Sequence, residues 1–276
     1  MKNKTWFITG ISSGLGKALA EAVIAHGDFV IGTFRQAEQV ADFNQKNAGK
    51  ALAVQLDLTN PIQIRQAMAI VGAQSGRLDV LVNNAGFGFA GAIEEAGDAE
   101  MRAVFDANFF GTMQLTQAVL PLMRRQRNGH IFQISSHSGF KGFPGFGVYG
   151  ASKFALEGAS EALAAEVAPL GIRLTIVEPG PFRTGFAGKA FQQANNHIAD
   201  YDGTAGIFRQ KIKAVDGKQE GDPAKAAQAI IRVCESENPP LRLVLGKVAV
   251  GTVTAKLQSV QADLDAWREV AERAVF

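Results

Sequence analysis

The feature that most restricts the fold is a glycine-rich segment near the start of the sequence. Residues 9–16 read Thr-Gly-Ile-Ser-Ser-Gly-Leu-Gly, between an apolar run at 6–9 and a helical pattern over about 14–26. Glycines between a strand and a helix allow a tight turn and let the backbone approach a pyrophosphate at the positive helix end. The Gly-x-x-x-Gly-x-Gly spacing is not the commoner Gly-x-Gly-x-x-Gly, and a plain helix-capping turn is the alternative. The segment predicts a dinucleotide site at the first strand–helix turn.

Apolar runs alternate with helical patterns along most of the chain. Strands are expected at 6–9, 29–34, 51–56, 78–82, 130–135, 172–178 and 241–245. Helices are expected over about 14–26, from Thr59 or Asn60 with Pro61 onward, over 98–127 and over 149–170. Alternation of this kind is typical of βαβ units, in which helices cover both faces of a parallel sheet. We therefore predict an α/β fold with a doubly wound, parallel seven-stranded sheet.

Composition excludes several classes of protein. With 47% apolar and 20% charged residues, the chain is neither disordered nor fibrous. The 28 basic and 26 acidic residues give a net charge of +2, which makes no case for nucleic acid as a partner. No apolar run approaches the roughly 20 residues that cross a bilayer. A single cysteine, Cys234, and the absence of a leader-like start favour a cytoplasmic protein with no membrane partner.

No proline-rich linker or shift in composition divides the chain, so we expect one domain over residues 1–276. The stretch 181–222 lacks clear periodicity, which favours a substrate-binding lid, with a mobile surface insertion as the alternative. A C-terminal helix is expected over about 255–274. Its apolar residues Val260, Leu264, Trp267 and Ala271 have helical spacing, which indicates core or a subunit contact.

The end of the second predicted strand bears on the choice of cofactor. An acidic residue there would bind the adenosine ribose and repel a 2′-phosphate, but residues 29–37 contain no Asp or Glu. Arg35 offers a planar guanidinium that can pair with that phosphate, and an exposed surface cation is the alternative. Asp57, after the third strand, is placed either to meet the adenine or to cap the next helix.

A second cluster comprises Ser136, Tyr149 and Lys153. Tyr149 and Lys153 are four residues apart and share one face of a predicted helix. A phenol has an ordinary pKa near ~10, and a nearby ammonium with a cationic nicotinamide ring would lower it. Such a tyrosine can exchange a proton with an alcohol or carbonyl oxygen while hydride moves, with Ser136 holding that oxygen. The alternative is a packed tyrosine beside a solvated lysine.

Other candidates are weaker. His137 follows the proposed serine and either lines the pocket or is a satisfied loop histidine. The phenylalanines 140, 143 and 146 line an apolar cleft or pack their loop onto the core. The four histidines show no metal-ligand spacing, so no metal is expected, and Cys234 fits a core position better than a nucleophile. Glu94 and Glu95 have no identifiable catalytic partner.

In these residues the chain resembles the short-chain dehydrogenase/reductase family, of the compact type with about 250 residues. The matching residues are Thr9–Gly16, Asn83-Asn84-Ala85-Gly86, Asn108, Ser136, Tyr149, Lys153 and Pro179-Gly180. The resemblance covers almost the whole chain and implies a Rossmann fold that binds NAD(P) and oxidises or reduces an alcohol–carbonyl pair. A looser likeness to reductases of steroid- or retinoid-like alcohols lies in the segments around Asp222-Pro223 and 238–242.

The resemblance also implies roles. Tyr149 would be the general acid/base, and Lys153 would lower its pKa and hold the nicotinamide ribose. Ser136 would orient the substrate oxygen, and Asn108 would hold a water that links Lys153 to a proton relay. Ser136 is preferred to Ser135 because the family's serine usually lies 13 residues before its tyrosine. The implied cofactor contacts are Gly10, Ser12, Ser13, Gly14, Leu15, Gly16, Arg35, Asp57, Leu58, Asn84, Ala85, Gly86, Tyr149, Lys153, Pro179, Gly180 and Thr184. The implied substrate contacts are Ser136, His137, Phe143 and Tyr149.

Within the family, Phe34-Arg35 is similar to the NADP-preferring pattern, although the glycine loop has Ser12 and Ser13 where many such members carry a basic residue. The resemblance implies an NADP(H)-dependent oxidoreductase acting on CH–OH groups, with NAD the less favoured cofactor. It also implies a homodimer or homotetramer formed through the long helices around 101–127 and 150–169. The alternative function is an NADP(H)-sensing regulator of the same fold. The length argues against a sugar-nucleotide epimerase.

Overall fold

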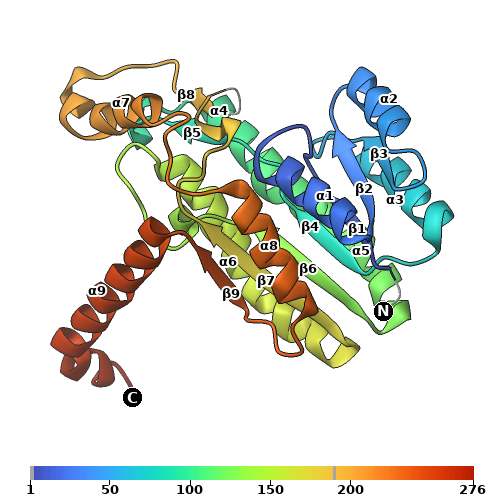
Figure 1. The fold of residues 1–276 in the computed structure, drawn as a ribbon. Helices are drawn as coiled ribbons and strands as arrows, with labels where there is room; N and C mark the ends of the chain where they lie inside the picture. Colours follow the sequence, from blue (N-terminus) through green and yellow to red (C-terminus); the bar gives the residue numbers. More distant parts are fainter. Residues whose placement is uncertain (1–2, 189–190) are drawn as a thin grey trace.

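The computed structural model describes residues 3–188 and 191–276. Its main sheet has seven parallel strands in the order β3-β2-β1-β4-β6-β7-β9 (Figure 1). The strands are β1 Thr5–Ile8, β2 Phe29–Phe34, β3 Ala51–Gln55, β4 Val80–Asn83, β6 Gly129–Ile134, β7 Ile172–Pro179 and β9 Arg242–Leu245. The order reverses between β1 and β4, as in doubly wound dinucleotide-binding sheets. The predicted fold class is confirmed.

Helices cover both faces of this sheet. One face carries α1 Gly14–His26, α2 Ala37–Lys46 and α8 Pro223–Glu235. The other carries α3 Pro61–Ser75, α5 Thr112–Gln126 and α6 Gly147–Val167. Successive side chains of β1 alternate between the two cores: Trp6 and Ile8 lie in the first, and Phe7 lies in the second. Because both faces are buried, each strand reads as an almost continuous apolar run.

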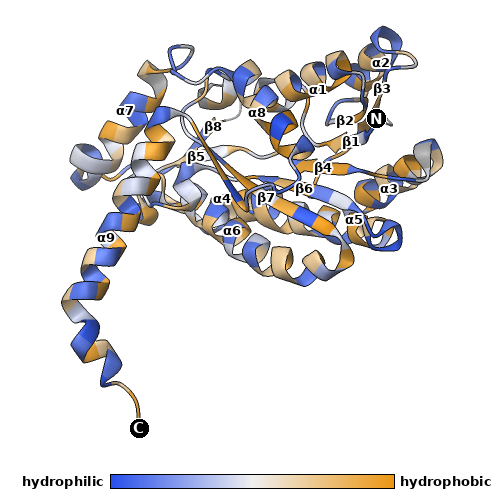
Figure 2. Cartoon of the chain, turned by 60° about the horizontal axis from the view of Figure 1, so that its bottom comes forward, coloured by the Kyte–Doolittle hydropathy of each residue, from blue (hydrophilic) through white to orange (hydrophobic). Residues whose placement is uncertain are grey.

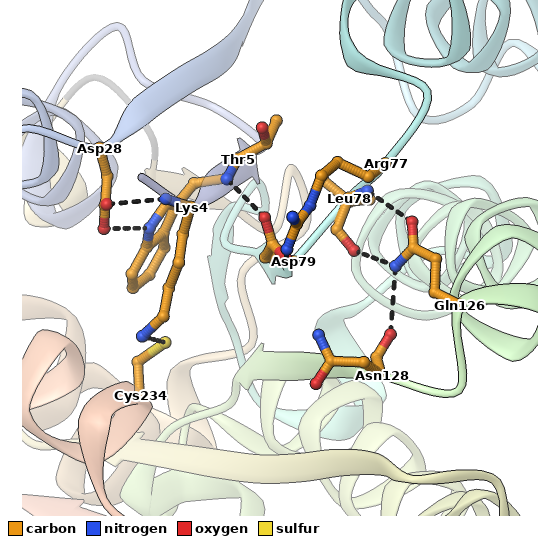
Figure 3. A network of polar contacts seen from close by, with 10 residues as sticks. Lys4, Thr5, Asp28, Arg77, Leu78, Asp79, Gln126, Asn128 and Cys234 are labelled. Atoms are coloured by element: carbon orange, nitrogen blue, oxygen red, sulfur yellow. Dashed lines mark hydrogen bonds and ion pairs between the residues drawn. The ribbon is translucent and has the colours of Figure 1, made fainter. Parts of the chain in front are cut away.

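Polar side chains fix the start of β1. The Trp6 indole Nε1 donates to Asp28 Oδ2 at 3.0 Å, and the backbone N–H of Thr5 donates to Asp79 Oδ2 at 2.8 Å. Figure 3 shows Lys4 reaching Cys234, with Nζ 3.6 Å from Sγ. Cys234 is buried in the core under α8, where burial raises the pKa of its thiol. The prediction that this cysteine is a core residue is confirmed.

The helix predicted over 98–127 is interrupted. It consists of α4 Asp98–Phe105, a π-helical turn at Asp106–Gly111, and then α5. This turn carries Asn108, which is fully buried. Its side-chain oxygen accepts a hydrogen bond from the Phe87 backbone N–H, and its side-chain amide donates one to the Phe87 carbonyl oxygen. π-Helical turns inside α-helices are frequent at functional sites, and this one brings Asn108 toward the carboxyl edge of the sheet.

Segment 181–222 is more regular than predicted. It contains the strand β8 Phe191–Gln193, which pairs in parallel with β5 Gly88–Ala90, and the helix α7 Ile207–Ala214. Figure 1 shows β8 and α7 at the carboxyl end of the main sheet, beyond α6. Both strands are three residues long, too short for the alternating pattern that identifies a strand in a sequence.

The last helix, α9 Lys247–Glu272, begins earlier than predicted and projects away from the body of the molecule (Figures 1 and 2). Residues Val260, Leu264, Trp267 and Ala271 are exposed, so the alternative that they belong to the core of this chain is wrong. Across the described residues, no helix has the length and apolar character needed to cross a membrane.

Candidate active site

The glycine-rich loop after β1 is tied to the end of β4. The Thr9 hydroxyl accepts hydrogen bonds from the backbone N–H groups of Asn84 and Ala85, both at 2.9 Å. The Asn84 side-chain amide donates to the carbonyl oxygens of Thr9 at 2.8 Å and Gly10 at 3.1 Å. These bonds hold the two loops together at the point where the strand order reverses, which is the place where such sheets bind ligands.

The start of α1 has the properties of an anion site. Gly14 has φ +61°, and a Cβ on Gly16 would lie 2.3 Å from the Asn84 side-chain nitrogen, so both positions require glycine. The N-cap residue Ser13 makes no side-chain capping bond, and the first turn contains no acidic residue. The N–H groups of this turn therefore face outward with a positive dipole end, which fits a pyrophosphate held by Ser12, Ser13 and Leu15.

The residues expected on the adenosine side lie at the ends of β2 and β3. Arg35 is exposed directly after β2. Asp57 accepts bonds from the Thr59 backbone N–H at 2.9 Å and hydroxyl at 2.7 Å, whereas Asn60 is the N-cap of α3. The alternative that Asp57 caps the next helix is therefore wrong. Leu58 is buried beside it.

The opposite side of the crevice is formed by the chain after β7. Pro179 ends that strand, and the Gly180 N–H donates to the Leu245 carbonyl oxygen at 2.9 Å. Thr184 then returns to the glycine loop, where its Cβ lies 3.2 Å from the position that a Cβ on Gly14 would occupy. The structure thus brings Thr184, which is far along the chain, against the start of α1.

Ser136 and Tyr149 meet in the interior of the carboxyl edge. Ser136 follows β6 and Tyr149 lies in the first turn of α6, where Ser136 acts to lower the pKa of the phenol. The neighbouring Ser135 instead donates to Glu157 Oε1 at 2.6 Å. The structure therefore places Ser136, and not Ser135, against the phenol. Tyr149 is only 5% exposed.

Lys153 lies one turn after Tyr149 and is also buried. Its Nζ donates to the Ile134 carbonyl oxygen at 2.9 Å and lies 5.8 Å from the centre of the Tyr149 ring. Asn108 is linked to the same helix, because its side-chain amide donates to the Ser152 hydroxyl at 3.3 Å. All four predicted catalytic side chains thus gather at one place, from the π-helical turn, the end of β6 and the first two turns of α6.

Burial dominates the electrostatics of this cluster. It raises the pKa of Tyr149 above its ordinary value, and the hydrogen bond with Ser136 opposes the rise. It lowers the pKa of Lys153 to about 8, and the Glu157 carboxylate opposes that fall. The expected lowering of the Tyr149 pKa is absent in the protein alone, because the effect of burial is the larger one.

Glu157, one turn beyond Lys153, is a site residue that the sequence analysis missed. Arg242 from β9 donates to Glu157 at 2.6 Å, to Glu178 at 2.5 Å and to Glu161 at 2.6 Å. Burial raises the pKa of both Glu157 and Glu178, and Arg242 opposes the rise. The i, i+4, i+8 spacing of Tyr149, Lys153 and Glu157 was the signal available in the sequence.

Aromatic side chains surround Tyr149. Phe146 stacks on its ring with centroids 4.3 Å apart, and Phe186 from the segment after β7 lies at 5.6 Å. Phe191 in β8 lies 6.0 Å from Phe146 and 6.1 Å from Phe186. The sequence reading missed Phe186 and Phe191, because only the fold brings the 181–222 segment to this position.

The other two phenylalanines of the 140–146 series have different neighbours. The Phe143 ring is 5.1 Å from His137, whose Nδ1 lies 3.3 Å from the Thr252 hydroxyl on α9. Burial lowers the pKa of His137. Phe140 packs under the Arg242 guanidinium at 5.1 Å. His137 thus has a polar partner on α9, and Phe143 packs against the apolar cluster that contains Phe146 and Tyr149.

Three glutamates hold the 191–214 region against the loop before α4. Buried Glu95 accepts from Arg209 at 2.9 Å and from the Ile198 N–H at 2.9 Å. Tyr201 donates to Glu94 at 2.5 Å, and the Asn195 N–H donates to Glu100 at 2.9 Å. Glu94 and Glu95, which had no partner in the sequence reading, thus anchor the segment that covers the aromatic cluster.

The fold and this site define a dinucleotide-binding α/β oxidoreductase. Residues 4–195 match the family model described as short chain dehydrogenase, and the chain belongs to this family. A solved structure of a short-chain dehydrogenase from Streptomyces avermitilis is 44% identical, with a TM-score of 0.92 and all of both chains covered. A structure titled "ElxO with NADP Bound" is 26% identical, with a TM-score of 0.74 and coverage of 90% of this chain and 99% of that one.

Two relatives whose names include a substrate are each 39% identical to this chain. A 3-ketodihydrosphingosine reductase of Bacteroides thetaiotaomicron is 39% identical over 262 residues, covering 94% of this chain and 93% of the relative. Retinol dehydrogenase 8 of Homo sapiens is 39% identical over 256 residues, covering 87% and 80%. The looser likeness to retinol dehydrogenase-like reductases is thereby confirmed, and the family binds NAD or NADP.

Proposed function

We propose that the protein is an NADP(H)-dependent oxidoreductase that interconverts an alcohol and a ketone or aldehyde, with Tyr149 as general acid/base. The observation that carries the proposal is the convergence of Ser136, Tyr149, Lys153 and Asn108 beside a glycine loop suited to a pyrophosphate. Packing alone does not require a buried phenol next to a buried ammonium at the carboxyl edge of such a sheet, because a phenylalanine and a leucine would fill the same space.

The protein's part in the reaction is proton transfer and positioning. When bound, the nicotinamide accepts a hydride from the carbinol carbon or delivers one to the carbonyl carbon. In reduction, the Tyr149 O–H donates its proton to the carbonyl oxygen; in oxidation, the phenolate takes the proton from the alcohol. Ser136 holds the reacting oxygen, and Lys153 supplies the positive charge that favours the phenolate. Asn108, which its hydrogen bonds to the Phe87 backbone hold in place, orients a water toward Lys153.

The preference for NADP is proposed from Arg35. This cation is exposed directly after β2, where a ribose-binding acid would otherwise stand, and its fork suits a 2′-phosphate. The ElxO structure, which is titled as an NADP complex, is consistent with this choice. The remaining cofactor contacts are those of the glycine loop, Asn84–Gly86 and Pro179–Thr184.

We assign an apolar substrate, with 181–222 as its lid. The Tyr149 ring lies beside the rings of Phe146 and of Phe186, which belongs to the lid. A substrate that reaches the phenol therefore displaces or contacts aromatic rings. Two relatives are named for 3-ketodihydrosphingosine and retinol, which are largely hydrocarbon. Chain-like or polyene alcohols and their carbonyl forms are therefore the first substrates to assay.

The test is the variant Tyr149→Phe. It should keep NADPH affinity within about threefold and lower kcat by at least ~10²-fold, the range of general acid–base catalysis. Adding Phe208→Tyr to this variant places a phenol in the same aromatic cluster but away from Ser136, and it should not restore kcat. Retained turnover in Tyr149→Phe would reject the assignment.

A regulator that senses NADP(H) is the alternative function. It would bind the cofactor through the same loop and show no turnover with any ketone, aldehyde or alcohol. A screen of such compounds with NADPH and NADP⁺ separates the two functions, because the complete Ser136–Tyr149–Lys153 cluster should give turnover with at least one class.

A further inference from the structure

Most of the large apolar residues of α9 follow a heptad; exposed Val248 and Val270 lie off it, and its member Val253 is half-buried. Val250, Val253, Leu257, Val260, Leu264 and Trp267 alternate spacings of three and four residues, and Ala271 and Ala274 continue the series. A sustained 3.5-residue repeat places its members on one stripe, the a and d positions of a coiled coil. Within the helix, which ends at Glu272, the stripe runs from Val250 to Ala271, or about 32 Å at 1.5 Å per residue.

This stripe has no partner within the described chain. Leu257 is 56% exposed, Val260 48%, Leu264 49% and Trp267 65%. Figure 2 shows hydrophobic and hydrophilic residues alternating along α9 as it leaves the body. Only the root of the helix touches the body: Ala249 is buried, and Thr252 meets His137. A free helix with a single apolar seam is marginal in water without a partner.

The charges beside the seam identify that partner. Beyond Thr254, the charged residues pair within the helix: Arg268 with Asp265 and Glu272, and Arg273 with Glu269. Lys256 and Asp263 are the exceptions, since neither has an ion pair in the part of the chain that the structure describes. Both occupy the g position of successive heptads, so they lie on the same side of the seam with opposite charge.

We infer that α9 pairs with α9 of a second copy of this chain as an antiparallel coiled coil. Reversing one helix sets g against g, so Lys256 of each copy faces Asp263 of the other, twice about the twofold axis. The same register stacks Leu257 on Val260, Val253 on Leu264 and Val250 on Trp267, so that in the last two layers a small side chain meets a large one. In a parallel pair, Asp263 would instead face Arg268, which is already paired.

A membrane surface fits the helix less well. From Leu257 to its C-cap Arg273, α9 carries four acidic and two basic residues, a net charge of −2. Helices that lie in anionic membrane surfaces are rich in lysine and arginine on their polar face. The pairing of two copies also differs from the expected contact through the helices around 101–127 and 150–169, because it uses an element outside the sheet's two layers.

Light scattering of the full chain over a range of concentrations tests the inference. The mass should fall by half on dilution, and Leu257→Asp or Leu264→Asp should keep it at the lower value at every concentration. Gln258→Asp, which adds the same charge one position off the seam, should leave the mass unchanged. These residues are exposed and far from the active site, so NADPH binding and circular dichroism should match the unsubstituted protein. An unsubstituted protein that stays monomeric, or a mass unaffected by both substitutions, overturns the inference.

Charge exchange tests the register. Lys256→Glu and Asp263→Lys should each weaken association by about 2–10-fold, the range of two exposed ion pairs. The double variant should restore the original association within about twofold. Failure of the double variant to restore it overturns the antiparallel register. Sedimentation with phosphatidylcholine–phosphatidylserine vesicles supplies the last arm: a monomer that binds vesicles through Leu264 overturns the pairing altogether.

Discussion

Arg209 on α7 reaches the carboxylate of Glu95, which is completely buried at the loop before α4, with Nη2 and Oε1 2.9 Å apart. Two backbone N–H groups, of Ala92 and Ile198, also donate to Glu95. These bonds lower the pKa of Glu95 although burial, the largest influence, raises it. One acidic side chain thus links Ile198 and Arg209 of the 181–222 segment to the loop before α4.

Arg209→Ala should loosen the lid. Removing the guanidinium leaves a buried carboxylate with fewer partners, at a cost of about 2 kcal/mol in local stability. We expect faster proteolysis within 191–214 and a raised KM, with a smaller change in kcat. Lys211→Ala, at an exposed position on the same helix, is the matched control. Equal proteolysis in the two variants would argue against the anchor.

Arg35→Ala should weaken NADPH binding about 10- to 100-fold and leave NADH nearly unchanged. The reason is the loss of charge-assisted hydrogen bonds to a 2′-phosphate, worth about 1.5–3 kcal/mol. Fluorescence titration with both cofactors measures it, and Arg65→Ala, another exposed arginine, should affect neither. Equal losses for NADPH and NADH would remove the phosphate role from Arg35.

Carbonyl reduction should decline as the pH rises through about 8. Lys153, with a pKa of about 8, loses its charge there, whereas the pKa of Tyr149 is raised and its proton is retained. Glu157→Gln removes the carboxylate that supports the charged lysine, so the alkaline limb of the kcat/KM profile should move to lower pH. Glu161→Gln, a half-exposed member of the Arg242 cluster, should leave the limb in place. Coincident profiles for all three proteins would contradict the coupling.

Buried His130 should make the fold sensitive to mild acid. Burial lowers its pKa to about 3, and its Nε2 lies 3.0 Å from the Thr175 hydroxyl. The ordinary histidine pKa is ~6.5, so the unfolded chain binds a proton that the native protein refuses. Its contribution to stability is complete above pH ~6.5 and is lost as the pH falls toward about 3.

Denaturant unfolding between pH 7 and 4.5 measures this effect. The free energy of unfolding should fall by up to ~1.4 kcal/mol per pH unit from this group, and less steeply in His130→Gln. His197→Gln, at an exposed histidine, is the matched control. Parallel curves for both variants would show that His130 does not titrate on unfolding.

The main sheet and the catalytic cluster were predictable because their signals are local. Apolar runs such as Val80–Val82 mark strands buried on both faces, and Tyr149 and Lys153 are placed by helical spacing alone. Asn60 with Pro61 marks the start of α3, as observed. Where residues close together in the sequence determine the geometry, the predictions and the structure agree.

The rest depends on tertiary contacts. The π-helical turn around Asn108 is shaped by bonds to Phe87, 21 residues away, and Phe186 reaches Tyr149 only through the return of the chain after β7. The pKa of Tyr149 rises because burial outweighs charge, which no spacing of residues reveals. The apolar stripe of α9 has the same spacing as a core helix, and only its projection from the body shows that it is uncovered.

The chain's two tryptophans occupy opposite environments: Trp6 is 1% exposed within the interior strand β1, and Trp267 is 65% exposed near the tip of α9. Their fluorescence emission therefore reports on two separate parts of the molecule: Trp6 on whether the sheet is folded, and Trp267 on the surroundings of α9. A red shift confined to the Trp267 component would signal separation of copies while the enzyme body stays folded, so one emission spectrum can distinguish dissociation from denaturation.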